Sequence, residues 1–281
     1  MKYNNKFIFA LLYLTCMLNV NAHEVDSHHT AAHQISAKAT YLGNEAVMIQ
    51  GADKKIIFDP FFHNDYKTYQ LVPQSIRNAI FNGDKPYDSI DIIFISHAHG
   101  DHFSAQDMLH FLQKHRQTKM VAPQQAVDAM FKLKGSEKIK GQVKAIALNY
   151  GDKVWQRNID DIKIEAVRIP HAGWPGRANV ENIVFRVSLD DKTRVIHMGD
   201  ADPDDAHFKP YKEHWQKKVT NTAFPPYWFF LSEQGNAILQ KRINAKEHVG
   251  LHVPVKIPYQ LQKSDKLYFY KPEQEHAITQ L

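Results

Sequence analysis

The segment Ser96-His97-Ala98-His99-Gly100-Asp101-His102 places four ligand-type side chains within six positions of a 281-residue chain. It directly follows the apolar run Ser89 to Ser96, which we expect to be a strand buried on both faces. A helix is expected to begin just after it, near Ser104, with apolar residues at helical spacing. The segment therefore occupies a loop between a buried strand and a helix, where side chains can converge on a ligand.

The spacing of the ligand-type residues predicts two neighbouring metal ions. Residues two apart in an extended segment point the same way, so His97 and His99 can face one ion. Gly100 lets the backbone turn, which allows Asp101 and His102 to face a second ion close by. A single histidine is more often a packed or surface residue than a ligand, and it is the set that indicates a metal site.

Cysteine is excluded as a ligand or nucleophile of the mature chain. Cys16 is the only cysteine, and it lies in an N-terminal segment that we expect to be removed. Histidine is the unusual residue, with 17 copies. Imidazole and carboxylate are the ligands expected for zinc when no thiolate is present, with manganese or iron as alternatives.

The segment resembles the His-x-His-x-Asp-His motif of the metallo-β-lactamase-fold hydrolases. The likeness extends along residues 41 to 254, because four further segments resemble the other motifs of that family in the same order. They are Tyr41-Leu42-Gly43 with Lys55 to Phe62, Ile169-Pro170-His171, Met198-Gly199-Asp200, and Gly250 to Pro254 with its central His252.

The resemblance implies a complete ligand set for two metals. The first metal would be held by His97, His99 and His171. The second would be held by Asp101, His102 and His252. Asp200 would bridge both ions, and Asp59 would support the ligand loops without binding metal itself. Each of His171, Asp200 and His252, taken alone, would be interpreted as a structural residue. Only their occurrence as a set indicates that they are metal ligands.

Two further segments resemble the lactonase-like branch of the family. Gly199-Asp200-Ala201-Asp202 and Pro226-Tyr227-Trp228-Phe229 are similar to that branch, which includes ascorbate-phosphate lactonase and is similar to N-acyl-phosphatidylethanolamine phospholipase D. One position departs from the pattern. Related chains often have histidine after Tyr-Leu-Gly, where this chain has Asn44, which puts its substrate chemistry in question.

The expected activity is hydrolysis of a small ester, lactone or phosphodiester by a hydroxide that bridges two divalent metal ions, with Asp101 orienting that hydroxide. Two alternatives stay open. Relatives reuse such a site with one iron, as in sulfur dioxygenases, and an exported metal-binding protein without catalysis would also carry these residues. The full second-metal set favours the hydrolase.

Residues that could contact substrate are less strongly indicated. Trp174 and Tyr227 are candidates for an apolar substrate wall, with core packing as the alternative. His197 alternates with Ile196 and Met198, which favours a packed strand residue over a proton donor. Two cations, Arg177 and Lys209, are interpreted as solvated surface charges, with contact to a phosphate as the alternative.

The domain organisation is expected to be simple. Residues 1–22 resemble a secretory signal, with Lys2 and Lys6 before a short apolar run and a small-residue exit at Ala22. Residues 23–36 are expected to be a flexible histidine-rich leader, and residues 37–281 one hydrolase domain. We therefore expect an exported protein, periplasmic or secreted, without stable membrane insertion.

The charge excludes some partners. The formal net charge of +5 falls to +3 when the two lysines of the expected signal are removed, which is too small and too evenly spread for a nucleic-acid groove. A small molecule is the expected partner. The sequence leaves the oligomeric state open.

The order of predicted elements indicates an α/β fold. Strands are expected at residues 38–42, 46–50, 55–58, 89–96, 119–122, 143–148, 153–156, 162–169, 182–189, 193–198 and 247–252. Helices are expected at residues 72–81, from 104, 123–133, 204–214 and 232–242. This order predicts a four-layer αβ/βα sandwich, in which two mixed sheets are covered by helices, as in the metallo-β-lactamase fold.

Overall fold

Two seven-stranded sheets form the centre of the computed structural model, which describes Met1 and residues 35–280. The first sheet has the order β14-β1-β2-β3-β4-β5-β6. Pairing is antiparallel from β14 to β3 and parallel from β3 to β6. Its strands are β1 (Ile35–Gly43), β2 (Ala46–Gln50), β3 (Lys55–Phe58), β4 (Ile92–Phe94), β5 (Lys119–Pro123), β6 (Val143–Ile146) and β14 (Glu275–Thr279).

The second sheet is also mixed, with the order β13-β12-β11-β10-β9-β8-β7. Pairing is parallel from β13 to β10 and antiparallel from β10 to β7. Its strands are β7 (Trp155–Ile159), β8 (Ile162–Arg168), β9 (Ile183–Ser188), β10 (Arg194–His197), β11 (Thr220–Phe224), β12 (Ala245–Gly250) and β13 (Leu267–Tyr268).

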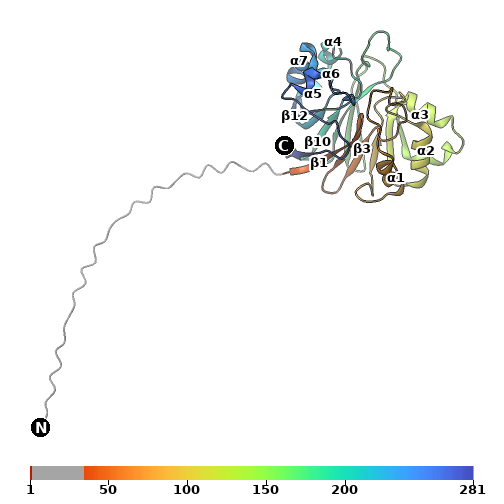
Figure 1. Ribbon diagram of the computed structural model, residues 1–281. Helices are drawn as coiled ribbons and strands as arrows, with labels where there is room; N and C mark the ends of the chain where they lie inside the picture. The colour runs from red at the N-terminus through yellow and green to blue at the C-terminus, as the bar shows by residue number, and fades with distance from the viewer. Residues whose placement is uncertain (2–34, 281) are drawn as a thin grey trace. The chain divides into compact units, whose positions relative to one another are not determined.

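Helices cover the outer face of each sheet, as Figure 1 shows, so the predicted four-layer fold is confirmed. The first sheet carries α1 (Gln74–Asn82), α2 (Ala105–Lys114), α3 (Gln124–Phe131) and the 3-10 helix η1 (Ser136–Gln142). The second carries α4 (Asp205–Phe208), η2 (Lys209–Tyr211), α5 (Lys212–Gln216), α6 (Trp228–Leu231), α7 (Glu233–Lys241) and α8 (Tyr259–Gln262).

Alternation along the strands explains the layers. In β4, Ile92 and Phe94 enter the core between the sheets, whereas Ile93 enters the core under α1 to α3. In β10, Val195 lies between the sheets and Ile196 lies under the second helical layer. Successive strand residues point to opposite faces, so a strand buried on both faces must be apolar throughout.

The strand before the ligand segment is shorter than predicted. It covers Ile92–Phe94 rather than residues 89–96. Ser89 has a left-handed backbone with φ of 53°, which interrupts an extended run. At the other end, the amide of Ser96 donates to the carboxylate of Asp59 and not to a neighbouring strand. The helix that follows begins at Ala105, because the Ser104 side chain caps its first turn.

The first described strand begins within the last two residues of the range expected for the leader. The leader was predicted to reach residue 36, but β1 begins at Ile35, which pairs with Thr279 of β14. The C-terminal strand was not predicted, and its pairing extends β1 toward the N-terminus. The expected signal, residues 1–22, and the leader up to residue 34 lie outside the described residues, apart from Met1. Within the described part, no helix is both long and apolar enough to cross a membrane.

A buried ion pair fastens the second helical layer to its sheet. Arg186 on β9 lies opposite Glu165 on β8 and donates to both carboxylate oxygens, at 2.9 and 3.2 Å. It also donates to the backbone carbonyls of His214 and Trp215 at α5. Both charged side chains are at least 96% buried, so each charge is compensated by the other and not by water.

We predict that Arg186→Met lowers the free energy of unfolding by about 3–5 kcal/mol, because Glu165 keeps a buried charge with only Lys218, at 3.6 Å, left to compensate it. Adding Glu165→Leu should recover part of the loss by removing that charge. Urea unfolding of both variants tests this. A double variant less stable than the single one would contradict it.

Candidate metal centre

The predicted ligands all follow the carboxyl ends of strands that meet at one edge. In the first sheet, β3 and β4 are parallel neighbours. In the second, β8, β10 and β12 run in one direction, since β9 is antiparallel to both β8 and β10, and β10, β11 and β12 are parallel. Side chains that follow such ends gather in one crevice. Residues that follow these five strands are Asp59, the segment from His97 to His102, His171, Asp200 and His252.

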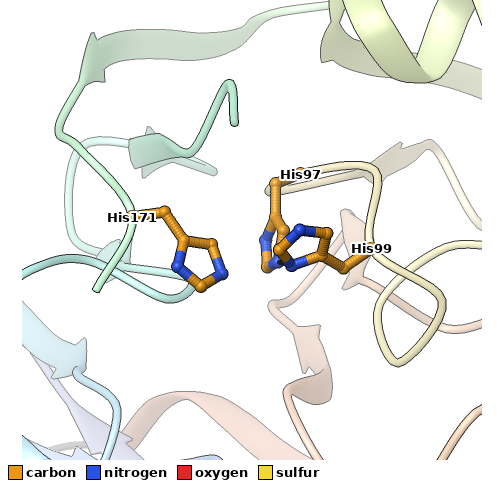
Figure 2. A group of neighbouring side chains, drawn as sticks. All are labelled: His97, His99 and His171. Atoms are coloured by element: carbon orange, nitrogen blue, oxygen red, sulfur yellow. Dashed lines mark hydrogen bonds between the residues drawn. The ribbon is translucent and has the colours of Figure 1, made fainter. Parts of the chain in front are cut away.

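Three histidines converge at one side of this crevice, as Figure 2 shows. The ring nitrogens of His97, His99 and His171 that face one another lie within 4.8 Å. His97 Nε2 and His99 Nδ1 are 3.2 Å apart. His97 and His171 are buried, and His99 is half-buried at the entrance. Three converging imidazole nitrogens can hold one divalent metal ion.

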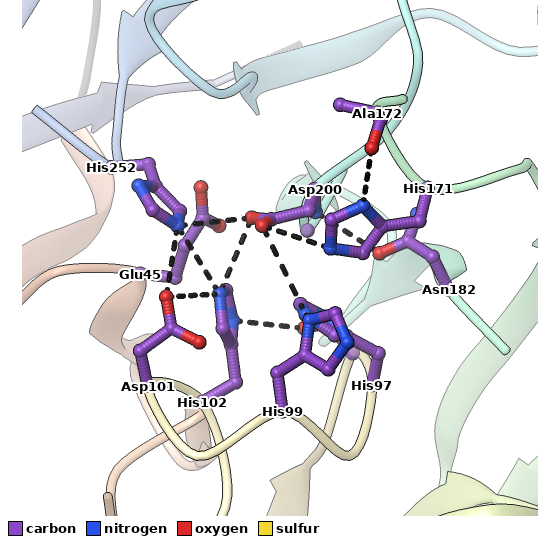
Figure 3. A network of polar contacts seen from close by, with 12 residues as sticks. Glu45, His97, His99, Asp101, His102, His171, Ala172, Asn182, Asp200 and His252 are labelled. Carbon is purple, nitrogen blue, oxygen red and sulfur yellow. Dashed lines mark hydrogen bonds and ion pairs between the residues drawn. The ribbon is translucent and has the colours of Figure 1, made fainter. Parts of the chain in front are cut away.

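A second set lies beside the first and consists of Asp101, His102, Asp200 and His252, whose ligand atoms also lie within 4.8 Å of one another. All four are buried. Figure 3 shows Asp200 between the two sets. Its Oδ1 is 3.2 Å from His252 Nε2, and its Oδ2 is 3.2 Å from His171 Nε2. One carboxylate therefore faces both sets.

The donor atoms fit divalent metal ions better than they fit one another. Among the described residues, His171 Nε2 and Asp200 Oδ1 are buried and make no hydrogen bond of acceptable geometry. His171 Nε2 nevertheless lies 3.2 Å from Asp200 Oδ2, and Asp200 Oδ1 lies 3.3 Å from His102 Nε2. The Nε2 atoms of His102 and His252 face each other at 3.3 Å. Buried polar atoms normally have partners, and converging lone pairs repel unless a cation or proton lies between them.

Burial and the close approach of the side chains shift several pKa values in this cluster. Burial and the neighbouring His102 hold the pKa of His97 well below its usual value. Burial also opposes the charged form of His252, but Asp200 and Asp101 outweigh it and raise the pKa of His252 to about 9. Burial opposes ionisation of Asp200 as well, yet His252 and His102 hold its pKa well below its usual value. The carboxylate that faces both sets is therefore ionised at neutral pH.

Asp59 supports the ligand segment from beneath. It is fully buried, and its amide donates to the carbonyl of Phe94 in the adjacent strand. Its carboxylate accepts hydrogen bonds from the amide and the hydroxyl of Ser96, and it lies 3.0 Å from His102 Nδ1. These contacts leave His102 Nε2 facing the crevice, so Asp59 orients a candidate ligand without facing the site itself.

A hydrogen bond from its backbone amide fixes the position of Asp200. Its amide donates to Asn182 Oδ1 at 3.0 Å, and the Asn182 amide group donates to the carbonyls of Ile169 and Met198. The preceding residue, Gly199, has a φ of 50°. A Cβ there would lie 2.5 Å from Asn182 Oδ1 and 2.7 Å from Ser96 Cβ, so this close approach requires glycine.

The turn between β1 and β2 touches the second set. Asn44, which is fully buried, donates through Nδ2 to the carbonyl of Asp101 at 3.0 Å. Its own carbonyl accepts from the amide of His252 at 3.1 Å. The next residue, Glu45, is fully buried, and its Oε2 lies 3.0 Å from Nε2 of the buried His197. The turn thus contacts two of the loops that carry candidate ligands and the end of β10, which precedes a third.

An open cavity of about 320 Å³ lies over the centre. Four of the predicted ligands line it, together with Tyr66, Thr68, Tyr69 and Arg177. The Tyr69 ring meets His252 edge-on at 4.1 Å. Burial and nearby carboxylates hold the pKa of Tyr69 above its usual value, so its hydroxyl remains a proton donor. A larger cavity lies elsewhere, around residues 87–91 and 111–118, and lacks these ligands.

The two residues predicted to form a substrate wall lie outside that lining. Trp174 packs against Tyr150 and His207, at ring distances of 5.1 and 5.7 Å. Tyr227 packs against Trp228, which in turn contacts His252 at 5.3 Å. Their contact with substrate stays a prediction. His197 is a packed strand residue, as its alternation predicted, and it stacks on Phe58 at 4.5 Å.

Sequence reasoning missed four residues with clear structural roles here. They are Glu45, Tyr69, Asn182 and Ser96 in its role as a partner of Asp59. Ser96 and Asn182 are polar residues at the ends of apolar runs, which is a signal that could have found them, whereas the sequence around Glu45 and Tyr69 gives no such signal. Asn44 was noticed only as a departure from a motif, without a role for its side chain.

The chain matches one family model. Residues 38–213 match the model of the beta-lactamase superfamily domain. This range contains every candidate ligand described above except His252.

Curated relatives are named as metal-dependent hydrolases. One of them, from Pyrococcus furiosus, is 30% identical over 166 residues, which are 58% of this chain and 61% of the relative. The chain therefore spans less than two thirds of the length of the curated relatives that it matches.

Solved structures with low identity share the fold. A possible metal-dependent hydrolase from Veillonella parvula superposes with a TM-score of 0.58 at 11% identity, covering 87% of this chain and all of the other. Igni18, a metallo hydrolase from Ignicoccus hospitalis, gives a TM-score of 0.54 at 16% identity, covering 85% and 97%.

We predict that Asn44→Gly weakens binding of the second metal ion by about 10- to 100-fold, because Asp101 loses the hydrogen bond that holds its backbone. Glycine adopts the φ of 44° found at this position without strain, so the change isolates the side chain. Metal affinity is measured by competition with a chromophoric chelator. Unchanged affinity for both ions would show that the Asn44 side chain does not position the site.

Proposed function

Since the chain belongs to the beta-lactamase superfamily, we propose that it is a metal-dependent hydrolase of a small ester, lactone or phosphodiester. One observation carries this proposal, which is the pair of ligand sets that share Asp200. The names of the curated relatives and of the superposed structures support the same reaction class. The lactonase-like branch, suggested by residues 199–202 and 226–229, is a finer proposal that these comparisons leave open.

The proposed ligands divide between two ions. His97, His99 and His171 would hold the first, and Asp101, His102 and His252 the second, with Asp200 shared. Nitrogen and oxygen donors of this kind suit zinc, with manganese or iron as alternatives. When bound, divalent ions of this type lower the pKa of water to about 7 and polarise a carbonyl or phosphoryl oxygen of the substrate.

The side chains have distinct tasks in this proposal. Asp101 lines the cavity and accepts a hydrogen bond from the attacking water, which orients it toward the substrate. Asp200, with its lowered pKa, stays an anion and donates no proton. Tyr69 keeps its hydroxyl proton and can donate a hydrogen bond to a substrate oxygen in which negative charge develops.

We predict about two divalent ions per purified chain and hydrolysis of generic phosphodiester or lactone substrates that is lost on chelation. Asp200→Ala should lower both metal content and turnover, because both sets lose a ligand. Elemental analysis of the wild type and the variant, beside the activity assay, tests this. Full activity of Asp200→Ala with two metals retained would contradict the bridging role.

Other outcomes would favour the alternatives. One iron per chain without hydrolysis would favour an oxygenase of the sulfur dioxygenase type. No catalysis, with metal binding retained, would favour a non-catalytic metal-binding protein. Deleting residues 23–34, which stops short of β1, separates these alternatives further. A storage role that depends on the histidine-rich leader should be lost, while catalysis should persist.

We also propose that the protein is exported to the periplasm or secreted, on the sequence of residues 1–22. Removal of that segment after Ala22 would leave a mature chain that begins at His23. N-terminal sequencing of the protein recovered from cell fractions tests this. A cytoplasmic chain that retains residues 1–22 would contradict it.

A further inference from the structure

The cavity over the metal centre has one permanently charged cation in its wall. Of the residues that line it, Arg177 is the one lysine or arginine. It lies six positions after His171, and its Nη1 is 3.4 Å from His171 Nδ1. The guanidinium therefore lies next to a candidate ligand of the first metal.

This guanidinium has no anionic partner within the described chain. Arg77, Arg186 and Arg242 each form an ion pair, but no carboxylate among residues 35–280 forms one with Arg177. The contact with His171 does not replace it. His171 Nδ1 is 2.8 Å from the carbonyl of Ala172, so this nitrogen carries the proton and cannot accept one from Arg177.

The loop that carries Arg177 is held in place. Asp202, two residues after the shared Asp200, accepts hydrogen bonds from the amides of Gly173 and Trp174, at 3.1 and 3.2 Å. The carbonyl of Arg177 itself accepts from the amide of Val180 at 3.0 Å. A fixed backbone limits the positions that the guanidinium can reach, and these include the wall of the cavity.

A cation at this place needs an explanation. Two divalent ions exceed the charge of the two carboxylates, Asp101 and Asp200, so the loaded centre is positive, and an arginine beside it is repelled. An anionic ligand between them removes the repulsion. Guanidinium groups bind carboxylate and phosphate through paired hydrogen bonds, which gives both orientation and specificity.

We propose that Arg177 is a specificity-determining residue that binds an anionic group, a phosphate or a carboxylate, on the substrate of the metal centre. The proposal rests on the proposed hydrolase function and narrows its substrate class to anions. Arg177 is exposed, as expected for a solvated surface charge, and the proposal adds a role for it in the wall of the cavity.

Binding of small probes tests the proposal without turnover. Phenylphosphonate and benzoate are titrated calorimetrically into the purified protein, with benzamide as the neutral analogue. Arg177→Gln should weaken binding of at least one anion by about 10- to 100-fold and leave benzamide unchanged. Loss for phenylphosphonate alone indicates a phosphate group, and loss for benzoate alone a carboxylate. Lys209→Gln is the matched control, because Lys209 is exposed and outside the cavity lining.

Kinetics supply the second readout. For bis(4-nitrophenyl) phosphate, Arg177→Gln should raise KM by about 10- to 100-fold with little change in kcat, whereas neutral 4-nitrophenyl butyrate should be cleaved as by the wild type. Equal losses for the two substrates, or anion binding equal to that of the wild type, would overturn the proposal. A wild type that cleaves neither substrate would count against the hydrolase, and the calorimetric titrations would still decide the role of Arg177.

Discussion

A buried carboxylate at the end of β3 fixes the loop on which the candidate metal centre depends. Asp59 is excluded from water, so its negative charge must be compensated by donors within the protein. The donors are the amide and hydroxyl of Ser96, with the ring of His102 nearby. The loop that begins with Ser96 also carries four ligand-type residues. The hydrogen bonds that Asp59 requires from Ser96 therefore help to set the direction in which those residues point. Burial of the Asp59 carboxylate, which is unfavourable by itself, thus fixes the geometry of the candidate metal site.

From that loop the centre is completed by the second sheet. His171, Asp200 and His252 come from strands that share a direction, so their ends meet the ligand segment at one edge. Asp202 then joins the loop of Asp200 to the loop of Arg177. A displacement of the shared carboxylate would therefore also displace the cation in the cavity wall. If Arg177 selects the substrate as proposed, Asp202 links substrate selection to the geometry of the candidate ligands.

Much of this arrangement could be predicted from sequence, because it follows from local pattern. The apolar run before His97 predicts a buried strand, and Ser104 predicts the start of α2. The features that the sequence did not predict involve buried polar residues. Strand β11, Thr220–Phe224, begins Thr-Asn-Thr and was missed, since buried polar residues are not typical of a strand. Asn221 has a partner that only the tertiary structure supplies, because its amide group donates to the carbonyl of Lys192. The role of Asn44 was hidden for the same reason, because its partners lie 57 and 208 positions away.

The pairing of the first described strand with the last has a consequence for the order of events in the life of the chain. Thr40 of β1 lies opposite Glu275 of β14, so the first sheet lacks this edge strand until residues 275–279 have been synthesised. His252 likewise follows β12, close to the C-terminus. The first sheet is incomplete without residues 275–279, and the second ligand set is incomplete without His252. Contacts between such distant positions also slow folding, since long loops must close first. Binding of a metal ion at the second set of candidate ligands therefore has to follow the synthesis of His252.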